Sequence, residues 1–215
     1  MRKLATLVLA SSLFVSLLPA EAVAATPSLG VPLQVRRGFF TETDIGGFFT
    51  VGGDNGYSNF QIYLQLGLGY QLTINDGAGL IPIGVHVGIG TNAQNCWAGL
   101  KADMSCSQSD NFTNTFINAS AGYLHRLGTG YVGSRLYFGG KLLGGVTLLD
   151  PRPIPDEADP TNTGLLVSPD VGAALSLEFA TSVDHFSVGL DAAYRLIIGP
   201  NISSLMFYFR VQYTF

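Results

Sequence analysis

The sequence predicts an all-β protein: an eight-stranded antiparallel transmembrane β-barrel with an up-and-down meander, following a cleaved signal peptide. Three observations lead to this fold class. Apolar residues alternate with polar or small ones over long segments, the connections alternate in length, and charge is scarce. Of 215 residues, 47% are hydrophobic and 12% are charged, against about 25% charged in ordinary soluble domains. After the first 25 residues no uncharged apolar run is long enough for a membrane-spanning helix.

Composition also excludes several kinds of function. The chain is too apolar and too aromatic for a disordered protein. With a net charge of −4, the chain lacks the excess of basic residues that is typical of a nucleic-acid-binding protein. We therefore expect lipids of an outer membrane as partners, no nucleic acid and no cofactor.

The N-terminal segment has the features of a secretory signal peptide. Arg2 and Lys3 precede an apolar stretch over Leu4–Leu18, and Ala22-Val23-Ala24 forms a cleavage site of small residues. An N-terminal membrane anchor is the alternative, but the apolar stretch is short for a span. We expect a signal peptide over residues 1–24, a periplasmic tail over 25–36 and an outer-membrane β-barrel over 37–215.

The clearest strand pattern covers Phe60–Ile74. Every even-numbered residue in this segment is apolar, and the odd-numbered ones are Gln, Tyr, Gly or Thr. Alternate residues of a strand point to opposite faces, so one face is continuously apolar. The run far exceeds the roughly 5–6 residues of a typical globular strand and suits a tilted strand that crosses a bilayer.

The same alternation recurs along the chain and predicts eight strands. They cover Arg37–Val51, Phe60–Ile74, Leu80–Gly90, Phe112–Leu124, Tyr131–Leu149, Leu165–Phe179, Phe186–Ile198 and Leu205–Phe215. Short connections alternate with longer ones, as in outer-membrane barrels with short periplasmic turns and long outside loops. The connection over Gly199–Ser203 is the exception, because it is short where a longer loop is expected.

The placement of charge decides which face points outward, since a soluble barrel with an apolar interior would show the same alternation. Charged residues lie on the polar face and suit a narrow lumen where acids and bases pair: Glu42, Asp44, Arg135, Lys141, Asp170, Glu178, Asp191, Arg195 and Arg210. We expect Glu42 and Asp44 to face basic residues across the barrel or on the closing strand. The candidate partners are Arg210, Arg135 and Lys141. Eight strands enclose an interior just wide enough for side chains to fill, so a plugged lumen is favoured over an open channel.

The last strand ends in aromatic and apolar residues at alternate positions: Phe207, Phe209, Val211, Tyr213 and Phe215. This pattern resembles the C-terminal targeting signature of bacterial outer-membrane barrels. The resemblance implies recognition by the barrel assembly machinery. An ordinary amphipathic strand is the alternative interpretation.

The overall plan resembles small outer-membrane barrels of the OmpX and OmpW kind. A narrower stretch, Arg36–Gly53, resembles the start of the CglE barrel protein of adventurous gliding motility. That resemblance implies a non-enzymatic component of a cell-surface complex in gliding motility or adhesion, with surface or periplasmic protein partners. A small channel for hydrophobic or osmotic solutes is the second hypothesis, and a lipid-directed enzyme is the third.

Candidate chemistry is sparse. Cys96 and Cys106 share one long connection, and an exported protein with two cysteines usually pairs them. A metal site is not favoured, because no His lies near the two cysteines. His86 faces the predicted lumen, whereas His125 and His185 fall at periplasmic turns rather than on an outside loop or rim. No serine is adjacent to His125, and general-base work needs such a partner within hydrogen-bond reach. No catalytic, cofactor or metal residue is therefore predicted, and we expect that the protein is not an enzyme.

A further connection, over residues 150–163, holds four prolines and four acidic residues, counting Asp150. A stiff acidic loop of this kind suits either a protein partner or plain solvent exposure.

Overall fold

A computed structural model describes residues 37–52, 56–57, 60–94, 111–150, 164–182, 185–199 and 202–215. Its elements are β1 (Gly38–Gly52), β2 (Gly56–Tyr57), β3 (Gln61–Ile74), β4 (Gly79–Gln94), β5 (Asn111–Arg126), α2 (Gly130–Gly133), β6 (Leu136–Asp150), β7 (Leu166–Ala180), β8 (Phe186–Ile197) and β9 (Ile202–Thr214). The predicted signal peptide, the N-terminal tail, both cysteines and most of the acidic connection lie outside the described residues.

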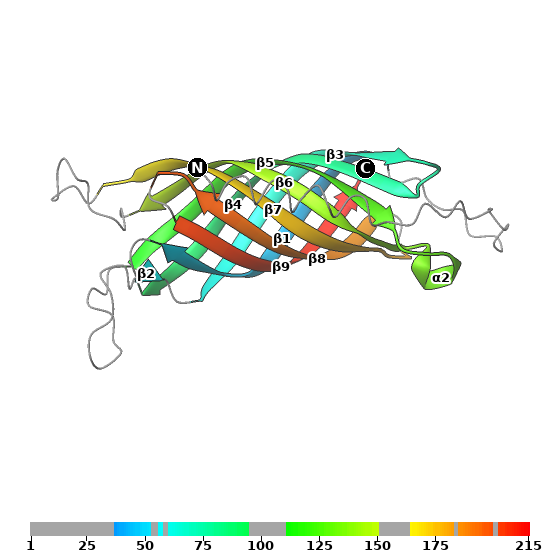
Figure 1. Ribbon diagram of the computed structural model, residues 1–215. Coiled ribbons are helices and arrows are strands. Elements are labelled where there is room, and N and C mark those ends of the chain that lie inside the picture. The colour runs from blue at the N-terminus through cyan, green and yellow to red at the C-terminus, as the bar shows by residue number, and fades with distance from the viewer. Residues whose placement is uncertain are drawn as a thin grey trace, which may run out of the picture. The chain divides into compact units, whose positions relative to one another are not determined.

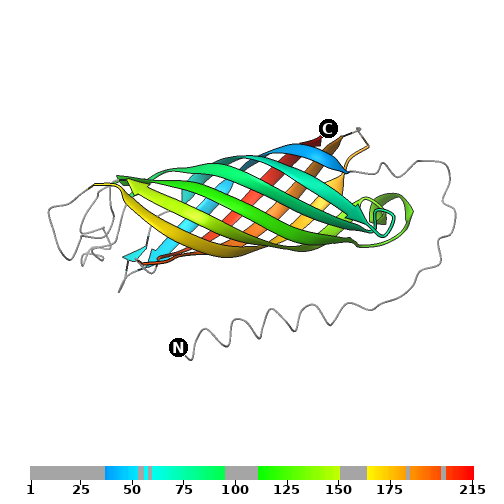
Figure 2. The ribbon, with the colours of Figure 1, turned by 90° about the horizontal axis from the view of Figure 1, so that it is seen from above.

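The long strands form one closed antiparallel barrel, which confirms the predicted fold class (Figures 1 and 2). Each of β3 to β9 pairs with its neighbour in the sequence, and β9 pairs back onto β1. The closing register places Ile45 opposite Phe209 and Asp44 opposite Arg210. The two-residue β2 pairs only with the end of β1. Closure gives every long strand two hydrogen-bonded neighbours, which a strand in lipid requires.

The two ends of the barrel differ in their connections. At one end, termed the short-turn end, β3–β4, β5–β6 and β7–β8 are joined through residues 75–78, 127–135 and 181–185. Asn75, Asp76 and Gly77 all have positive φ angles, which favours Asn, Asp and Gly in such tight turns. The opposite end, termed the long-loop end, holds the other four connections. The described residues contain no helix long and apolar enough to span a membrane.

One strand begins later than the sequence predicts. The alternation starts at Tyr131, but β6 starts at Leu136 because the one-turn helix α2 and a turn precede it. Gly130 has a φ of 82°, and the amide of Gly128 donates to the carbonyl of Gly133. Glycines thus fold this segment back on itself before the strand begins. Figure 1 shows α2 at the short-turn end.

Candidate functional site

The outer face of the barrel is a continuous apolar belt. On β3, Leu64, Leu66 and Leu68 are exposed, and the Gln or Gly residues between them are buried. The same parity holds on the other long strands, so large apolar side chains cover the outside. A soluble monomer rarely exposes a contiguous apolar patch of more than a few hundred Å². This surface is therefore suited to hydrocarbon.

The lumen is filled by buried side chains in layers, which can be followed along β6. Tyr137 belongs to an apolar cluster at the short-turn end, Lys141 to a charged layer and Leu143 to a central apolar cluster. Thr147 then reaches a second polar layer, and Leu149 joins an apolar cluster at the long-loop end. Charged groups are thus enclosed between apolar ones.

The central cluster contains Phe48, Tyr63, Phe116, Leu143, Ala174, Ala193, Met206 and Tyr208. Its rings meet edge to face: the centroids of Phe48 and Phe116 are 5.8 Å apart, and those of Phe48 and Tyr63 are 6.0 Å apart. Phe48 and Phe116 are completely buried. This aromatic packing spans the lumen between the two polar layers.

In the charged layer, Glu42 of β1 pairs with His86 of β4 across the intervening strand β3. The Oε1 atom of Glu42 lies 2.7 Å from Nε2 of His86. Gly67 on β3 lies between them, and a Cβ atom there would come within 2.4 Å of the His86 ring and 2.6 Å of Glu42 Cγ. The glycine therefore makes space for the pair.

Arg210 of β9 is the most connected cation of this layer. Its guanidinium lies 3.0 Å from Glu178 and 3.1 Å from Asp191, and it also donates to Ser176 at 3.2 Å. A Cβ atom at position 189 would lie 2.8 Å from the guanidinium, so Gly189 gives it room. Lys141 approaches the same Asp191 carboxylate at 3.7 Å.

A second buried pair lies beyond the central cluster. Arg195 donates to Asp170 at 3.0 Å, and Thr147 donates to the other carboxylate oxygen at 2.7 Å. The guanidinium carbon of Arg195 lies 4.6 Å from the ring centroid of Phe116, a cation–π contact. These contacts join the polar layer to the aromatic cluster.

The structure places eight of the nine predicted luminal charges in the buried interior. Arg135 is the exception, since it lies in the turn before β6 and is only partly buried. Glu42 does face a basic residue, but this residue is His86, and the candidate Arg210 pairs with Glu178 and Asp191 instead. Although Asp44 and Arg210 are register partners, Gln65 donates to Asp44, and Arg210 reaches inward to β7 and β8.

Sequence reasoning did not place Phe48, Phe116 and Met206 in the lumen, where they help to build the central apolar cluster. Phe48 and Met206 have the same parity along their strands as Asp44 and Arg210, so alternation alone was enough to place them inside. The pairing of His86 with Glu42 was also missed. The signal for it was Gly67 on β3, a small residue that lies between polar side chains on the two flanking strands.

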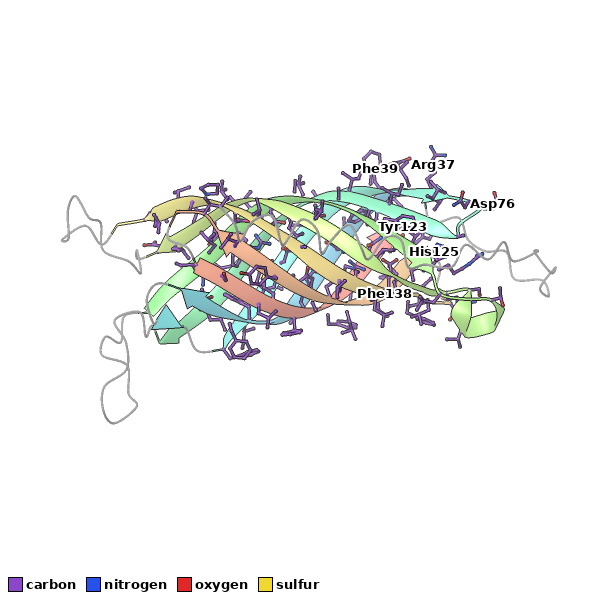
Figure 3. The ribbon with its side chains drawn as sticks, viewed as in Figure 1. Arg37, Phe39, Asp76, Tyr123, His125 and Phe138 are labelled. Carbon is purple, nitrogen blue, oxygen red and sulfur yellow. The ribbon has the colours of Figure 1, made fainter. Side chains whose placement is uncertain are left out.

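Aromatic residues gather on the outer face at both ends. Near the short-turn end, Phe39 packs edge to face on Tyr70 at 5.0 Å, and Tyr213 contacts Phe186 at 4.9 Å and Phe215 at 5.1 Å. Near the long-loop end, Phe49 packs on Phe60 at 5.3 Å. Figure 3 shows Phe39 and Tyr123 among the side chains of the short-turn end. Such rings are typical of membrane–water interfaces.

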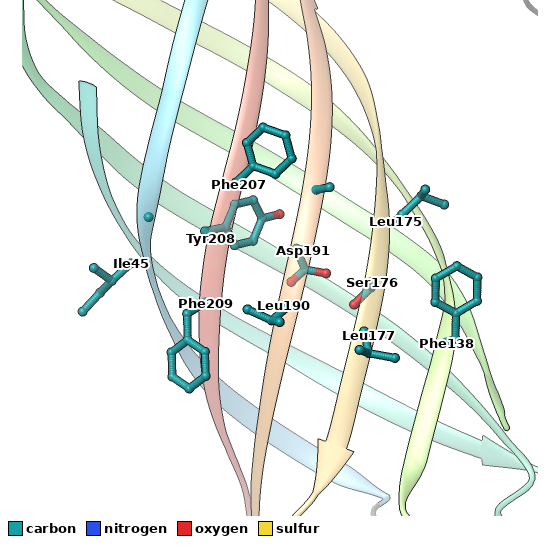
Figure 4. A pocket seen from close by; sticks show the side chains of 12 residues that line it. Ile45, Phe138, Leu175, Ser176, Leu177, Leu190, Asp191, Phe207, Tyr208 and Phe209 are labelled. Atoms are coloured by element: carbon teal, nitrogen blue, oxygen red, sulfur yellow. The ribbon is translucent and has the colours of Figure 1, made fainter. Parts of the chain in front are cut away.

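A shallow apolar groove of about 450 Å³ crosses the outer face from β6 over β7, β8 and β9 to β1 (Figure 4). Ala192 lies in it, flanked by Phe207 on β9 and Leu175 on β7, which are its register partners. The groove contains no outward charged group that could perform chemistry. Among the described residues, no three His, Cys, Asp or Glu side chains are grouped as a metal site requires.

A closed barrel with an apolar outer face and a charged, filled interior has the architecture of the small transmembrane β-barrels. The sequence matches no protein-family profile and no curated protein. Among solved structures, the fold is similar to Ail, the attachment invasion locus protein of Yersinia pestis, in complex with the heparin analogue sucrose octasulfate. The TM-score is 0.51 at 10% identity, covering 83% of this chain and 99% of Ail.

Two further structures of Ail align over similar lengths. The crystal structure of Ail gives a TM-score of 0.44 at 11% identity over 83% of this chain and 99% of Ail. The structure of the outer-membrane protein Ail in a phospholipid nanodisc gives 0.38 at 15% identity over 82% and 99%. At these identities the likeness concerns the fold alone.

Proposed function

We propose that the chain is an integral protein of a bacterial outer membrane and a non-enzymatic component of a cell-surface complex. In this proposal the long-loop end faces outside and the lumen is closed. The observation that carries it is the contrast between an exposed apolar outer face and a buried, charged interior. A soluble barrel would need the opposite arrangement, with its apolar side chains inside.

Electrical conductance tests the closed lumen. The three apolar clusters lie at different levels and leave the charged layers enclosed between them. We expect the purified barrel in a planar bilayer to give no steady current above that of protein-free membrane. Steady ionic conductance would favour the second hypothesis, a small outer-membrane channel.

The proposal that the protein is not an enzyme rests on the partners of its histidines. His86 is buried against Glu42, Nδ1 of His125 lies 3.1 Å from the hydroxyl of Tyr123, and Nδ1 of His185 lies 2.6 Å from the carbonyl of Thr214. In the described residues, neither exposed histidine has a Ser or carboxylate partner. We expect no hydrolysis or acyl transfer when the barrel is incubated with phospholipids, and turnover above that of a heat-denatured sample would contradict this.

The role in a surface complex rests on the resemblance of Arg36–Gly53 to a gliding-motility barrel and on a fold shared with a protein named for attachment and invasion. We infer that deletion of the gene lowers surface adhesion or gliding of the cells that carry it. Complementation with the full chain should restore the behaviour. Complementation with a chain whose residues 151–163 are replaced by a Gly/Ser linker should restore the membrane level but not the behaviour, if this acidic connection binds the partner.

The barrel assembly machinery is the partner proposed for β9. Changing Tyr213 and Phe215 together to Ser should leave export intact and reduce insertion into the outer membrane. Refolding of the same variant into detergent micelles should remain possible, because micelles require no recognition. Normal outer-membrane levels of the variant would contradict the proposed recognition.

A further inference from the structure

The short-turn end carries positive charge together with its aromatic residues. Arg37 and His125 are exposed, and Arg126 is partly exposed at the end of β5. In the described part of this end, Asp76 is the sole acidic side chain. The described part of this rim therefore carries more basic than acidic side chains where the apolar belt stops.

The strand register places these groups around an apolar lane. Gly38 pairs with Gln71, so Arg37 lies beside Leu72, and Leu72 pairs with Ile81. The register of β4 with β5 continues this row to Tyr123. Arg37 and Tyr123 are thus three strand spacings apart, about 14 Å at roughly 4.8 Å per spacing. Half-buried Leu72 and Ile81 form the floor between them.

The far side of the lane is held by Tyr123 and His125. The Tyr123 hydroxyl lies 3.1 Å from Nδ1 of His125, and the two rings are 6.3 Å apart. This contact orients the imidazole, and His125 as a whole is exposed. Arg126 follows directly, but it has the parity of buried Leu124 and belongs to the inner face at the end of β5. Figure 3 shows Arg37, Tyr123 and His125 on this part of the barrel.

We propose that this surface, the phosphate rim formed by Arg37, Leu72, Ile81, Tyr123 and His125, binds the headgroup of an anionic glycerophospholipid. Arginine matches phosphate oxygens through paired N–H donors, and Tyr favours the headgroup level of a bilayer. Acyl chains attached to that headgroup continue over the apolar belt, where Leu68 and Val85 are exposed. Free phosphate would use the cations but not the apolar floor.

The charge balance selects an anionic lipid over a zwitterionic one. A phosphatidylcholine headgroup brings a choline cation to the same basic side chains, Arg37 and His125, whereas phosphatidylglycerol brings none. Each arginine near an anionic membrane surface strengthens binding about fivefold. This inference rests on the proposed membrane location, since it requires the belt to face lipid.

Native mass spectrometry of the detergent-purified full chain tests the proposal. The protein is titrated with phosphatidylglycerol or phosphatidylcholine of identical acyl chains. We expect wild type to retain phosphatidylglycerol preferentially, and Arg37→Gln to lower that preference about fivefold. Arg37→Gln combined with His125→Gln should lower it further. Asp76→Asn is the matched control at the same end, and it should leave the preference unchanged or increase it.

Each outcome is informative. Equal retention of the two lipids by wild type, or an unchanged preference in the double variant, would overturn the phosphate rim while leaving the membrane barrel intact. Retention of neither lipid would count against the membrane location itself. Displacement of the lipid by an excess of inorganic phosphate alone would show that the site recognises free phosphate rather than a lipid. Heat-dependent gel migration checks that each variant is folded. We expect all variants to fold, because Arg37 and His125 are both exposed.

Discussion

Leu66 and Gln65 are neighbours on β3, yet they face opposite environments. Leu66 is 61% exposed on the outer face, whereas Gln65 is 5% exposed inside, where it accepts from Tyr63 and donates to Asp44. The outer face requires only that a side chain be apolar. The inner face requires particular partners at particular positions. The two faces of one wall therefore tolerate different substitutions.

The largest effect is expected where a luminal cation is removed. Arg210→Met leaves Glu178 and Asp191 buried without their guanidinium partner, and breaking a buried ion pair costs about 3–5 kcal/mol. Denaturant unfolding in detergent micelles measures this loss. Val211→Ala, on the adjacent outward residue, is the control and should cost much less. Equal losses for the two variants would mean that the luminal network is not specific.

The next effect reverses the comparison by placing charge on the outer face. Leu66→Arg should destabilise the barrel in lipid vesicles by about 2–4 kcal/mol if Leu66 lies near the bilayer centre. Gln65→Arg should cost less, because the new cation lies beside Asp44. Folding titrations in vesicles compare the two. A greater loss of folding stability for Gln65→Arg would indicate that the outer face does not contact lipid.

A smaller effect is expected from one methyl group inside the lumen. Gly67→Ala puts a Cβ atom within 2.6 Å of both His86 and Glu42, and overpacking of this kind costs about 1–3 kcal/mol. Gly144→Ala is the matched control, because the nearest atom to its Cβ is a carbonyl oxygen 3.9 Å away. Unfolding titrations of both variants in micelles should separate them. Similar stabilities would mean that the Glu42 and His86 side chains can shift to admit the methyl group without loss of stability.

The same contrast explains how much the sequence could predict. Parity along a strand was sufficient to place Gln65 inside and Leu66 outside, because side chains alternate strictly. Parity says nothing about which luminal groups touch, since long side chains reach across the barrel. Arg210 pairs with β7 and β8 rather than with its register partner Asp44. Only the closed barrel brings those groups together.

Arg135 shows a second limit of the sequence. The alternating pattern includes Arg135, but Gly130 and Gly133 allow a one-turn helix before the strand, so β6 begins only at Leu136. Local glycine conformation prevailed over periodicity there. At the β3–β4 turn the opposite occurred, because the Asn-Asp-Gly sequence itself favours the positive φ angles that the turn adopts.

The smallest predicted effect tests whether the outer face has specific positions of its own. Tyr213 contacts Phe186, Phe215 and His185 near the short-turn end, and aromatic pairs contribute about 0.5–1.5 kcal/mol beyond area burial. Tyr213→Leu should therefore destabilise the barrel in vesicles by roughly that amount. Phe207→Leu, in the middle of the same strand, should be close to neutral, because hydrocarbon accommodates aromatic and aliphatic side chains alike. If Phe207→Leu costs as much as Tyr213→Leu, the aromatic cluster has no interfacial role, and the apolar groove beside Phe207 is the more specific part of the outer face.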